Sequence, residues 1–229
     1  MIAIIGAMEE EVAEILKYID LEEKSEYNGY LFYQGKMNNH DVVLMQSGIG
    51  KVNASISTTI LFNHFDIDIV LNVGSAGGLK LNQEVGDIVI SKYVAHHDVD
   101  VTVFGREIGE VPGMPRYFEA DPQLLSLTKS IIEKNNYRSH TGLIVSGDQF
   151  ISKKEQVETI LNHFNEAMCS EMEAASIAQV SHVFNKRFII LRSLSDVFNK
   201  GDSSIQFDEY LKKASQASAK ICYDLVSNL

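Results

Sequence analysis

Short apolar runs alternate along the chain with stretches whose apolar residues recur at helical spacing. Residues 2–6 form such a run, and residues 8–19 after it carry apolar side chains three or four positions apart. The same succession recurs over residues 42–64, and residues 67–73 form a further apolar run. Because buried parallel strands have this continuous apolar character, the first part of the chain predicts strands alternating with helices.

The rest of the chain continues this alternation. Apolar runs predict strands from residue 88 towards 96, at 143–145 and at 188–191. Helices are predicted at residues 121–133, 154–161, 171–184 and from about 207 to the last residue. Asp121-Pro122 is typical of a helix start, because a capping aspartate precedes a proline that needs no backbone donor.

Length and composition favour one α/β domain. The chain has 229 residues, of which 45% are hydrophobic and 22% charged, and no low-complexity linker or internal repeat divides it. We therefore expect a single domain over residues 1–229 rather than two small ones. The loop that contains Pro112 and Pro115 is long enough to indicate a function of its own.

Charge and cysteine content argue against several partners. With 20 Lys+Arg against 31 Asp+Glu, the net charge of −11 would repel a nucleic-acid backbone, so we expect no nucleic-acid partner. Cys169 and Cys222 lack the spacing of a zinc site or a disulfide framework. The N-terminal apolar run is too short for a signal peptide, and no later run reaches the length of a membrane span. We therefore expect a cytoplasmic location and no membrane partner.

Two glycine-rich segments follow predicted strands, at the positions where α/β sheets bind ligands. Residues 48–53 resemble the start of a dinucleotide fingerprint, but Asn53 occupies the third glycine position, so a tight turn is favoured. Residues 74–78 could cradle a ligand at close approach, or form a turn that requires positive φ. The residues alone do not decide between these two interpretations.

Acidic residues occur at two predicted helix starts. Glu9, Glu10 and Glu11 follow the first strand, where the helix dipole favours carboxylates and one of them could act as a general base for water. Glu171 and Glu173 are two positions apart and cannot share one helix face, so at most one is expected in a buried site. The small and apolar neighbours of Glu173 favour it, rather than Glu171, as the buried residue.

Arg192 and Asp196 follow the apolar run at residues 188–191, which brings both charges to the carboxyl edge of the predicted sheet. Two interpretations stay open for them. They could form a structural salt bridge, or Asp196 could be a partly buried acid that protonates a leaving group.

Several segments carry a family resemblance together. They are IIGAMEEE at residues 4–11, SGIGKVNA at 47–54, NVGSAG at 72–77, HD at 97–98 with FG at 104–105, SGDQFI at 146–151, EMEA at 171–174 and RSLSD at 192–196. The chain resembles, nearly end to end, the methylthioadenosine/S-adenosylhomocysteine nucleosidases of the purine nucleoside phosphorylase superfamily. The resemblance implies a three-layer α/β sandwich with a central mixed, largely parallel twisted sheet flanked by helices.

The resemblance also implies a reaction and the residues that perform it. Such an enzyme hydrolyses the N-glycosidic bond of both nucleosides and releases adenine, without a metal or cofactor. Glu11 would hold the attacking water, and Asp196 would protonate N7 of adenine. Glu173 would bind the ribose hydroxyls beside Met172, with Arg192 nearby.

The remaining implied contacts surround the substrate. Ser75 would help to set the ribose and the water, Phe150 would stack on adenine, and the Ile151 backbone would meet the polar edge of the base. The ribose and alkylthio end would be lined by Met8, Ile49 and Phe207, and in a homodimer by Val101, Phe104 and Pro112 of the partner subunit.

Some positions of the chain depart from the family pattern. Ser170, Arg106 and residues 197–202 differ from the usual pattern, which bears on the pocket edge and on the preference for short or long 5′ substituents.

A phosphorylase of the same superfamily is the nearest alternative function, because Lys51 and Arg192 could attract phosphate. Two further alternatives are a nucleosidase for other adenine nucleosides and a non-catalytic sensor of nucleosides or dinucleotides.

Overall fold

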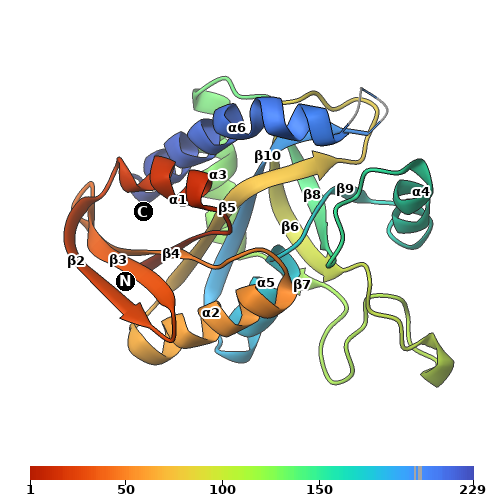
Figure 1. Cartoon of the computed structure of the whole chain (residues 1–229), viewed down its shortest axis with the longest axis horizontal. Coiled ribbons are helices and arrows are strands. Elements are labelled where there is room, and N and C mark those ends of the chain that lie inside the picture. The colour runs from red at the N-terminus through yellow and green to blue at the C-terminus, as the bar shows by residue number, and fades with distance from the viewer. Residues whose placement is uncertain (199, 201–202) are drawn as a thin grey trace.

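The computed structural model describes residues 1–198, 200 and 203–229, and its middle layer is a ten-stranded mixed sheet (Figure 1). The strands are β1 (Ile2–Gly6), β2 (Asp20–Tyr27), β3 (Tyr30–Met37), β4 (His40–Gln46), β5 (Ile69–Gly78), β6 (Ile88–His96), β7 (Phe118–Glu119), β8 (Ser139–Ser146), β9 (Ala167–Glu171) and β10 (Arg187–Val197). The helices are α1 (Glu9–Leu16), α2 (Lys51–His64), α3 (Pro122–Lys134), α4 (Lys154–His163), α5 (Ala174–Val183) and α6 (Ser203–Val226). The predicted α/β sandwich is confirmed.

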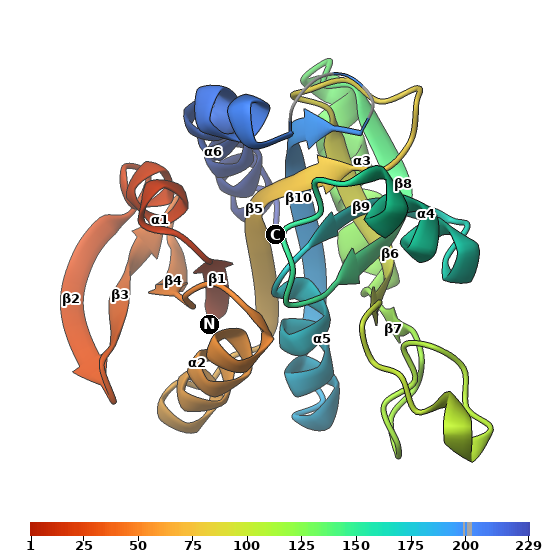
Figure 2. The same ribbon diagram turned by 45° about the vertical axis from the view of Figure 1, so that its right-hand side comes forward.

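Helices cover both faces of the sheet (Figures 1 and 2). α1, α3 and α6 lie together on one face, where α6 contacts β5 and β10, whereas α2 and α5 pack against each other on the opposite face. Small side chains allow α5 to approach the sheet, since Ala174, Ala175 and Ala178 are fully buried. The predicted cap of α3 also forms, because the Asp121 side chain accepts two backbone hydrogen bonds at the helix start.

Five strands of the sheet close into a ring. β10 pairs in parallel with β5 and antiparallel with β6, and β6, β8, β9 and β5 complete the circuit. From β5 the sheet continues through β1 and β4 to the antiparallel strands β3 and β2. The ring brings the C-terminal halves of β5 and β10 side by side, with Gly77 in register with Asp196.

β5 and β10 are longer than the sequence predicts. Residues 74–78 and the segment from Arg192 to Asp196 belong to these strands rather than to loops after them. The glycines of β5 all have negative φ, so the turn interpretation of residues 74–78 is wrong. Close approach of neighbouring side chains is the reason for glycine there, as the site below shows.

Some elements are absent from the sequence prediction. β2 and β3 form an antiparallel hairpin where no strand is predicted, and β7 and β9 are missed as well. The helix predicted at residues 171–184 begins only at Ala174, because Glu171 is still part of β9.

Across the described residues, no helix is both long and apolar enough to cross a bilayer. The same residues contain no group of three or more His, Cys, Asp or Glu side chains placed to hold a metal ion. Cys169 and Cys222 are free thiols in the core. The cytoplasmic location and the undivided single domain stay predictions.

Candidate active site

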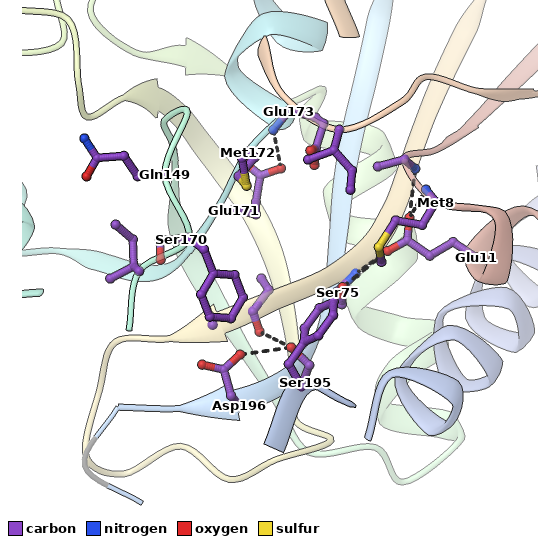
Figure 3. Close-up of a pocket in the computed structure, with 17 residues that line it drawn as sticks. Met8, Glu11, Ser75, Gln149, Ser170, Glu171, Met172, Glu173, Ser195 and Asp196 are labelled. Carbon is purple, nitrogen blue, oxygen red and sulfur yellow. Dashed lines mark hydrogen bonds between the residues drawn. The ribbon is translucent and has the colours of Figure 1, made fainter. Parts of the chain in front are cut away.

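A cavity of about 240 Å³ opens where the carboxyl ends of the strands meet (Figure 3). Its wall comes from the ends of β5, β9 and β10, from the segments after β1, β4 and β8, and from α6. Ten of the residues that the family resemblance assigns to substrate or catalysis line it: Met8, Glu11, Ile49, Ser75, Phe150, Ile151, Met172, Glu173, Asp196 and Phe207.

Hydrogen bonds from two segments fix Glu11 at the cavity wall. Its side chain, in the first turn of α1, is 3% exposed. Oε2 accepts from the backbone N–H of Ala7 at 2.8 Å and of Met8 at 3.2 Å. Oε1 accepts from Ser75, at 2.9 Å from the backbone N–H and at 3.3 Å from the hydroxyl. These donors hold one carboxylate in a single orientation, which selects Glu11 from the three successive glutamates.

A buried arginine lies behind the cavity. Arg192 is 1% exposed, and its Nη2 donates to Glu171 Oε2 at 2.5 Å and to Asn72 Oδ1 at 2.8 Å. Glu173 Oε2 lies 3.7 Å from the same nitrogen. Arg192 is therefore an internal counter-ion of two glutamates and does not itself line the cavity.

Gly74 lets this arginine approach Glu11 as well. A Cβ at position 74 would lie 2.3 Å from Arg192 Nη1 and 2.8 Å from Glu11 Oε1, distances that real Cβ atoms do not reach. The missing side chain thus leaves the space in which the guanidinium and the carboxylate meet. One buried cation consequently faces the three carboxylates of Glu11, Glu171 and Glu173.

The two glutamates on either side of Met172 have pKa shifts in opposite directions. Burial opposes the charge of Glu171, but Arg192, the Ser146 hydroxyl and two backbone N–H groups outweigh it, so the pKa of Glu171 is lowered. Burial and the neighbouring charge of Glu171 raise the pKa of Glu173 to about 8. Burial thus favours the protonated form of Glu173, and in that form the carboxyl group can donate as well as accept a hydrogen bond.

The prediction that at most one of these two glutamates enters a buried site is wrong. Glu171 is 8% and Glu173 6% exposed, and both line the cavity. The argument from helix faces does not apply, because Glu171 ends β9 and Glu173 is the N-cap of α5. Glu171 also accepts the backbone N–H of Ala174, so it serves the helix start and the buried ion pair together.

Asp196 reaches the cavity from β10 (Figure 3). It is 3% exposed, and the Ser195 hydroxyl donates to its Oδ1 at 3.0 Å. A Cβ on Gly77 of β5 would lie 3.2 Å from Asp196 Oδ2, so glycine leaves room for this carboxyl group. The ion pairs of Arg192 go to Glu171 and Glu173, and the salt-bridge interpretation of Arg192 and Asp196 therefore finds no support.

An aromatic wall faces the carboxylates. Phe150, after β8, and Phe207, on α6, pack edge to face with ring centroids 5.7 Å apart. Phe150 is 45% exposed, so its ring is open for a flat ligand to stack upon. Ile151 and Gln149 extend this wall, and the Gly50 backbone N–H across the cavity donates to Glu173 Oε1 at 3.0 Å.

Three predicted site residues lie away from the cavity of their own chain. Val101, Phe104 and Pro112 belong to the long loop between β6 and β7, which projects from the body of the molecule (Figure 2). Phe104 is 80% exposed, and Arg106 forms an ion pair with Glu110 of the same loop.

The other departures from the family pattern lie closer to the cavity. Ser170 lines it. Of residues 197–202, Asn199, Gly201 and Asp202 lie outside the described residues.

Sequence reasoning missed the polar network behind the cavity. Asn72 lies in the middle of an apolar strand and is fully buried, where it donates to the Ile5 carbonyl and accepts from Arg192. Ser146 ends β8, and its hydroxyl donates to Glu171. A signal was present, because a polar side chain inside a buried strand requires a hydrogen-bonding partner.

The cations that could attract phosphate are both engaged. Lys51 pairs with Asp98, and Arg192 pairs with Glu171. No lysine, arginine or histidine lines the cavity as far as the described residues form it. This lining does not favour a phosphate anion, whereas it suits an uncharged nucleoside.

Comparisons with known proteins agree with the fold. The Phosphorylase superfamily profile matches residues 1–227 and gives the class of protein. A 5′-methylthioadenosine/S-adenosylhomocysteine nucleosidase of Exiguobacterium sp. is 47% identical over 229 residues, which cover 100% of this chain and 98% of that protein. The chain belongs to the family of 5′-methylthioadenosine/S-adenosylhomocysteine nucleosidases.

Solved structures of this family superpose closely. The nucleosidase of Neisseria meningitidis in complex with methylthio-immucillin-A has a TM-score of 0.95 and 40% identity, covering 100% of this chain and 99% of that one. The nucleosidase of Colwellia psychrerythraea in complex with adenine has a TM-score of 0.95 and 42% identity, covering 100% of this chain and 95% of that one.

Proposed function

We propose that this protein hydrolyses the N-glycosidic bond of 5′-methylthioadenosine and S-adenosylhomocysteine and releases adenine and the 5′-thio-substituted ribose. The observation that carries the proposal is the presence of two buried carboxyl groups, Glu11 and Asp196, on different elements of one cavity beside an exposed aromatic ring. The names of the relatives support the same substrates.

The chemistry follows from charge development along the bond that breaks. Cleavage leaves positive charge on the ribose and negative charge on adenine, so carboxylates near the sugar and an acid near the base stabilise the transition state. Glu11 holds the water and takes its proton, and Asp196 gives a proton to the leaving adenine. Water thus attacks the anomeric carbon while the carbon–nitrogen bond breaks.

Binding is divided among the other cavity residues. Glu173 exchanges hydrogen bonds with the ribose hydroxyls, and Ser75 orients both the ribose and Glu11. Phe150 stacks on adenine, and the backbone of Ile151 meets the polar edge of the base. Met8, Ile49 and Phe207 surround the 5′-thio substituent.

The test is direct. Purified protein is incubated with 5′-methylthioadenosine, with and without phosphate, while free adenine and the sugar product are measured by chromatography and mass spectrometry. We expect adenine and an unphosphorylated methylthioribose in both conditions. A requirement for phosphate would identify a phosphorylase instead, and tight binding without adenine release would identify a nucleoside sensor.

We also infer that the protein works as a homodimer, in which the long loop completes the cavity of the partner subunit. Val103 and Phe104 are 85% and 80% exposed at the tip of this loop, and exposed apolar side chains of this size favour an interface. Dilution should lower the specific activity as dimers dissociate. A monomer in sedimentation that keeps full activity would contradict the dimer.

A further inference from the structure

Three segments at the rim of the cavity are joined by side chains that do not line it. Lys51 begins α2, Asp98 follows β6, and Asp148 lies in the loop after β8. The Lys51 ammonium pairs with Asp98 Oδ1, and Asp98 Oδ2 accepts the backbone N–H of Asp148 at 2.9 Å. Asp148 Oδ1 accepts the backbone N–H of Lys51 at 2.8 Å, which closes the cycle.

The cycle connects two parts of the substrate site. Asp148 is two residues before Phe150 and three before Ile151, which form the aromatic wall. Lys51 directly follows Gly50, whose backbone N–H holds Glu173. The hydrogen bond from Lys51 to Asp148 therefore fixes the purine wall relative to the carboxyl group that faces the ribose.

Two glycines let the segments approach this closely. A Cβ on Gly50, whose φ is +95°, would lie 3.1 Å from Asp148 Oδ1. A Cβ on Gly147 would lie 2.4 Å from the His97 ring and 3.1 Å from Asp98 Cγ. Larger side chains at these positions would separate the segments. The contact therefore depends on glycine at both positions.

The Lys51–Asp98 ion pair is the charged contact of the cycle. Burial opposes the charge of Asp98, but the Lys51 ammonium and the Asp148 N–H outweigh it and lower the pKa of Asp98. Lys51 and Asp98 are only 17% and 21% exposed, which shields the pair from solvent, whereas Asp148 lies at the surface. A change at Asp148 therefore removes a link at the rim without opening the core.

We propose that Lys51, Asp98 and Asp148 form a positioning clamp that sets the Phe150–Ile151 wall against the Glu173 side of the cavity and thereby determines purine affinity. The inference rests on the proposed function for its substrate. None of the three touches the reacting atoms, so the clamp acts through binding. Loss of the clamp weakens the binding of adenine and of the nucleoside alike, while the chemical step at Glu11 and Asp196 is nearly unchanged.

The experiment compares Asp148→Ala, which removes the acceptor, with Asp148→Asn, which keeps an oxygen for the Lys51 N–H. Asp148→Ala should raise KM for 5′-methylthioadenosine and the Kd of adenine by roughly tenfold, as expected for one charge-assisted hydrogen bond, with kcat changed less than about threefold. Asp148→Asn should restore most of the affinity. Asp41→Ala, which breaks the exposed ion pair of Lys36 on β3 and β4, is the matched control and should change neither constant.

Three results would overturn the clamp: unchanged KM and Kd in Asp148→Ala, a fall in kcat without a change in KM, or an equal loss in Asp148→Asn. If Asp148→Ala does not fold, Lys51→Met supplies the test, with a smaller rise in both constants expected because the backbone hydrogen bond remains. Calorimetric titration with adenine separates this inference from the proposed function. Wild-type protein that binds adenine but releases none from the nucleoside refutes only the function, and protein that does neither overturns both.

Discussion

The two ends of the cavity are built by different means. The carboxylate end is formed by Glu11, Glu171 and Glu173, with Arg192 behind them. Each of these residues is at most 8% exposed, and hydrogen bonds from strands and helix starts hold them. The aromatic end, formed by Phe150, Ile151 and Phe207, lies on a loop and on α6, and Phe150 is 45% exposed.

In the proposed function, this difference separates the residues that move protons from those that bind the base. Groups that move protons require fixed geometry and a controlled dielectric, which the strand ends and the buried arginine supply. A surface that admits and releases a flat ligand requires access instead, and the clamp at its base limits how far the loop can move. We expect changes at the carboxylate end to affect kcat and changes at the aromatic end to affect KM.

The largest expected effect is at Glu11. Glu11→Gln keeps the shape of the side chain but cannot take a proton from water, so hydrolysis should fall by about 10²–10⁴-fold while substrate affinity is largely kept. Steady-state kinetics together with titration of the unhydrolysed nucleoside measures both quantities. Glu10→Gln is the matched control, because Glu10 is exposed and does not line the cavity. Retained turnover in Glu11→Gln would move the base to another residue.

Asp196→Asn should affect substrates differently, according to whether the leaving group must be protonated. The variant should still bind adenine. Its rate of cleavage of adenosine-type substrates should fall by about 10²–10⁴-fold, because the amide does not donate an acidic proton. A synthetic nucleoside whose leaving group departs as a stable anion should be spared. Single-turnover cleavage of both substrates in wild type and variant makes the comparison. Equal losses on the two would show that Asp196 does not act as the acid.

Gly74→Ala should disturb the carboxylate end without removing any polar group. The new Cβ would overlap Arg192 Nη1 and Glu11 Oε1, so these charges must move apart. Overpacking of this kind costs about 1–3 kcal/mol, and kcat should fall because Glu11 is displaced. Urea denaturation and kinetics test both effects. Gly86→Ala is the control, since a Cβ there meets no atom within 4 Å and only its positive φ of 91° adds strain. Unchanged kcat in Gly74→Ala would contradict the close contact.

The last expected effect is a pH dependence of stability. The pKa of Glu173 is raised from 4.5 to about 8 by burial and by Glu171, so the folded state binds a proton that the unfolded state has released between these values. The resulting stabilisation is complete below about pH 4.5 and is lost as pH rises through about 8. Wild type should therefore lose stability relative to Glu173→Gln over this range, measured as the difference in free energy of unfolding at several pH values. A constant difference would contradict the raised pKa.

The sequence predicts the buried strands well because their apolar runs have no other explanation. β1, β4, β6 and β8 and their following helices lie where such runs indicate them. β2 is missed because its residues, DLEEKSEY, are largely exposed and form no apolar run. β9 is missed because the sequence pattern predicts a helix from Glu171 onward, and Glu171 is the last residue of this strand.

The candidate site shows the same limit at the level of single residues. The resemblance names ten residues that line one cavity, and most of them belong to short motifs at or just after strand ends. It does not show the counter-ion arrangement, in which Arg192 lies behind the wall between Glu171 and Asn72. That arrangement depends on contacts between β5, β9 and β10, which only the closed ring of strands brings together.

The closed ring has a consequence for the order in which the molecule folds. β5 and β10 are adjacent in space, yet their paired residues are more than a hundred positions apart in the chain. Contacts of such long sequence separation form slowly, because the entropy of closing the intervening chain opposes them. Ser75 and Asp196 lie on these two strands, so the cavity can be completed only when β10 joins β5. A growing chain would thus complete the cavity only after β10 has been synthesised and has paired with β5.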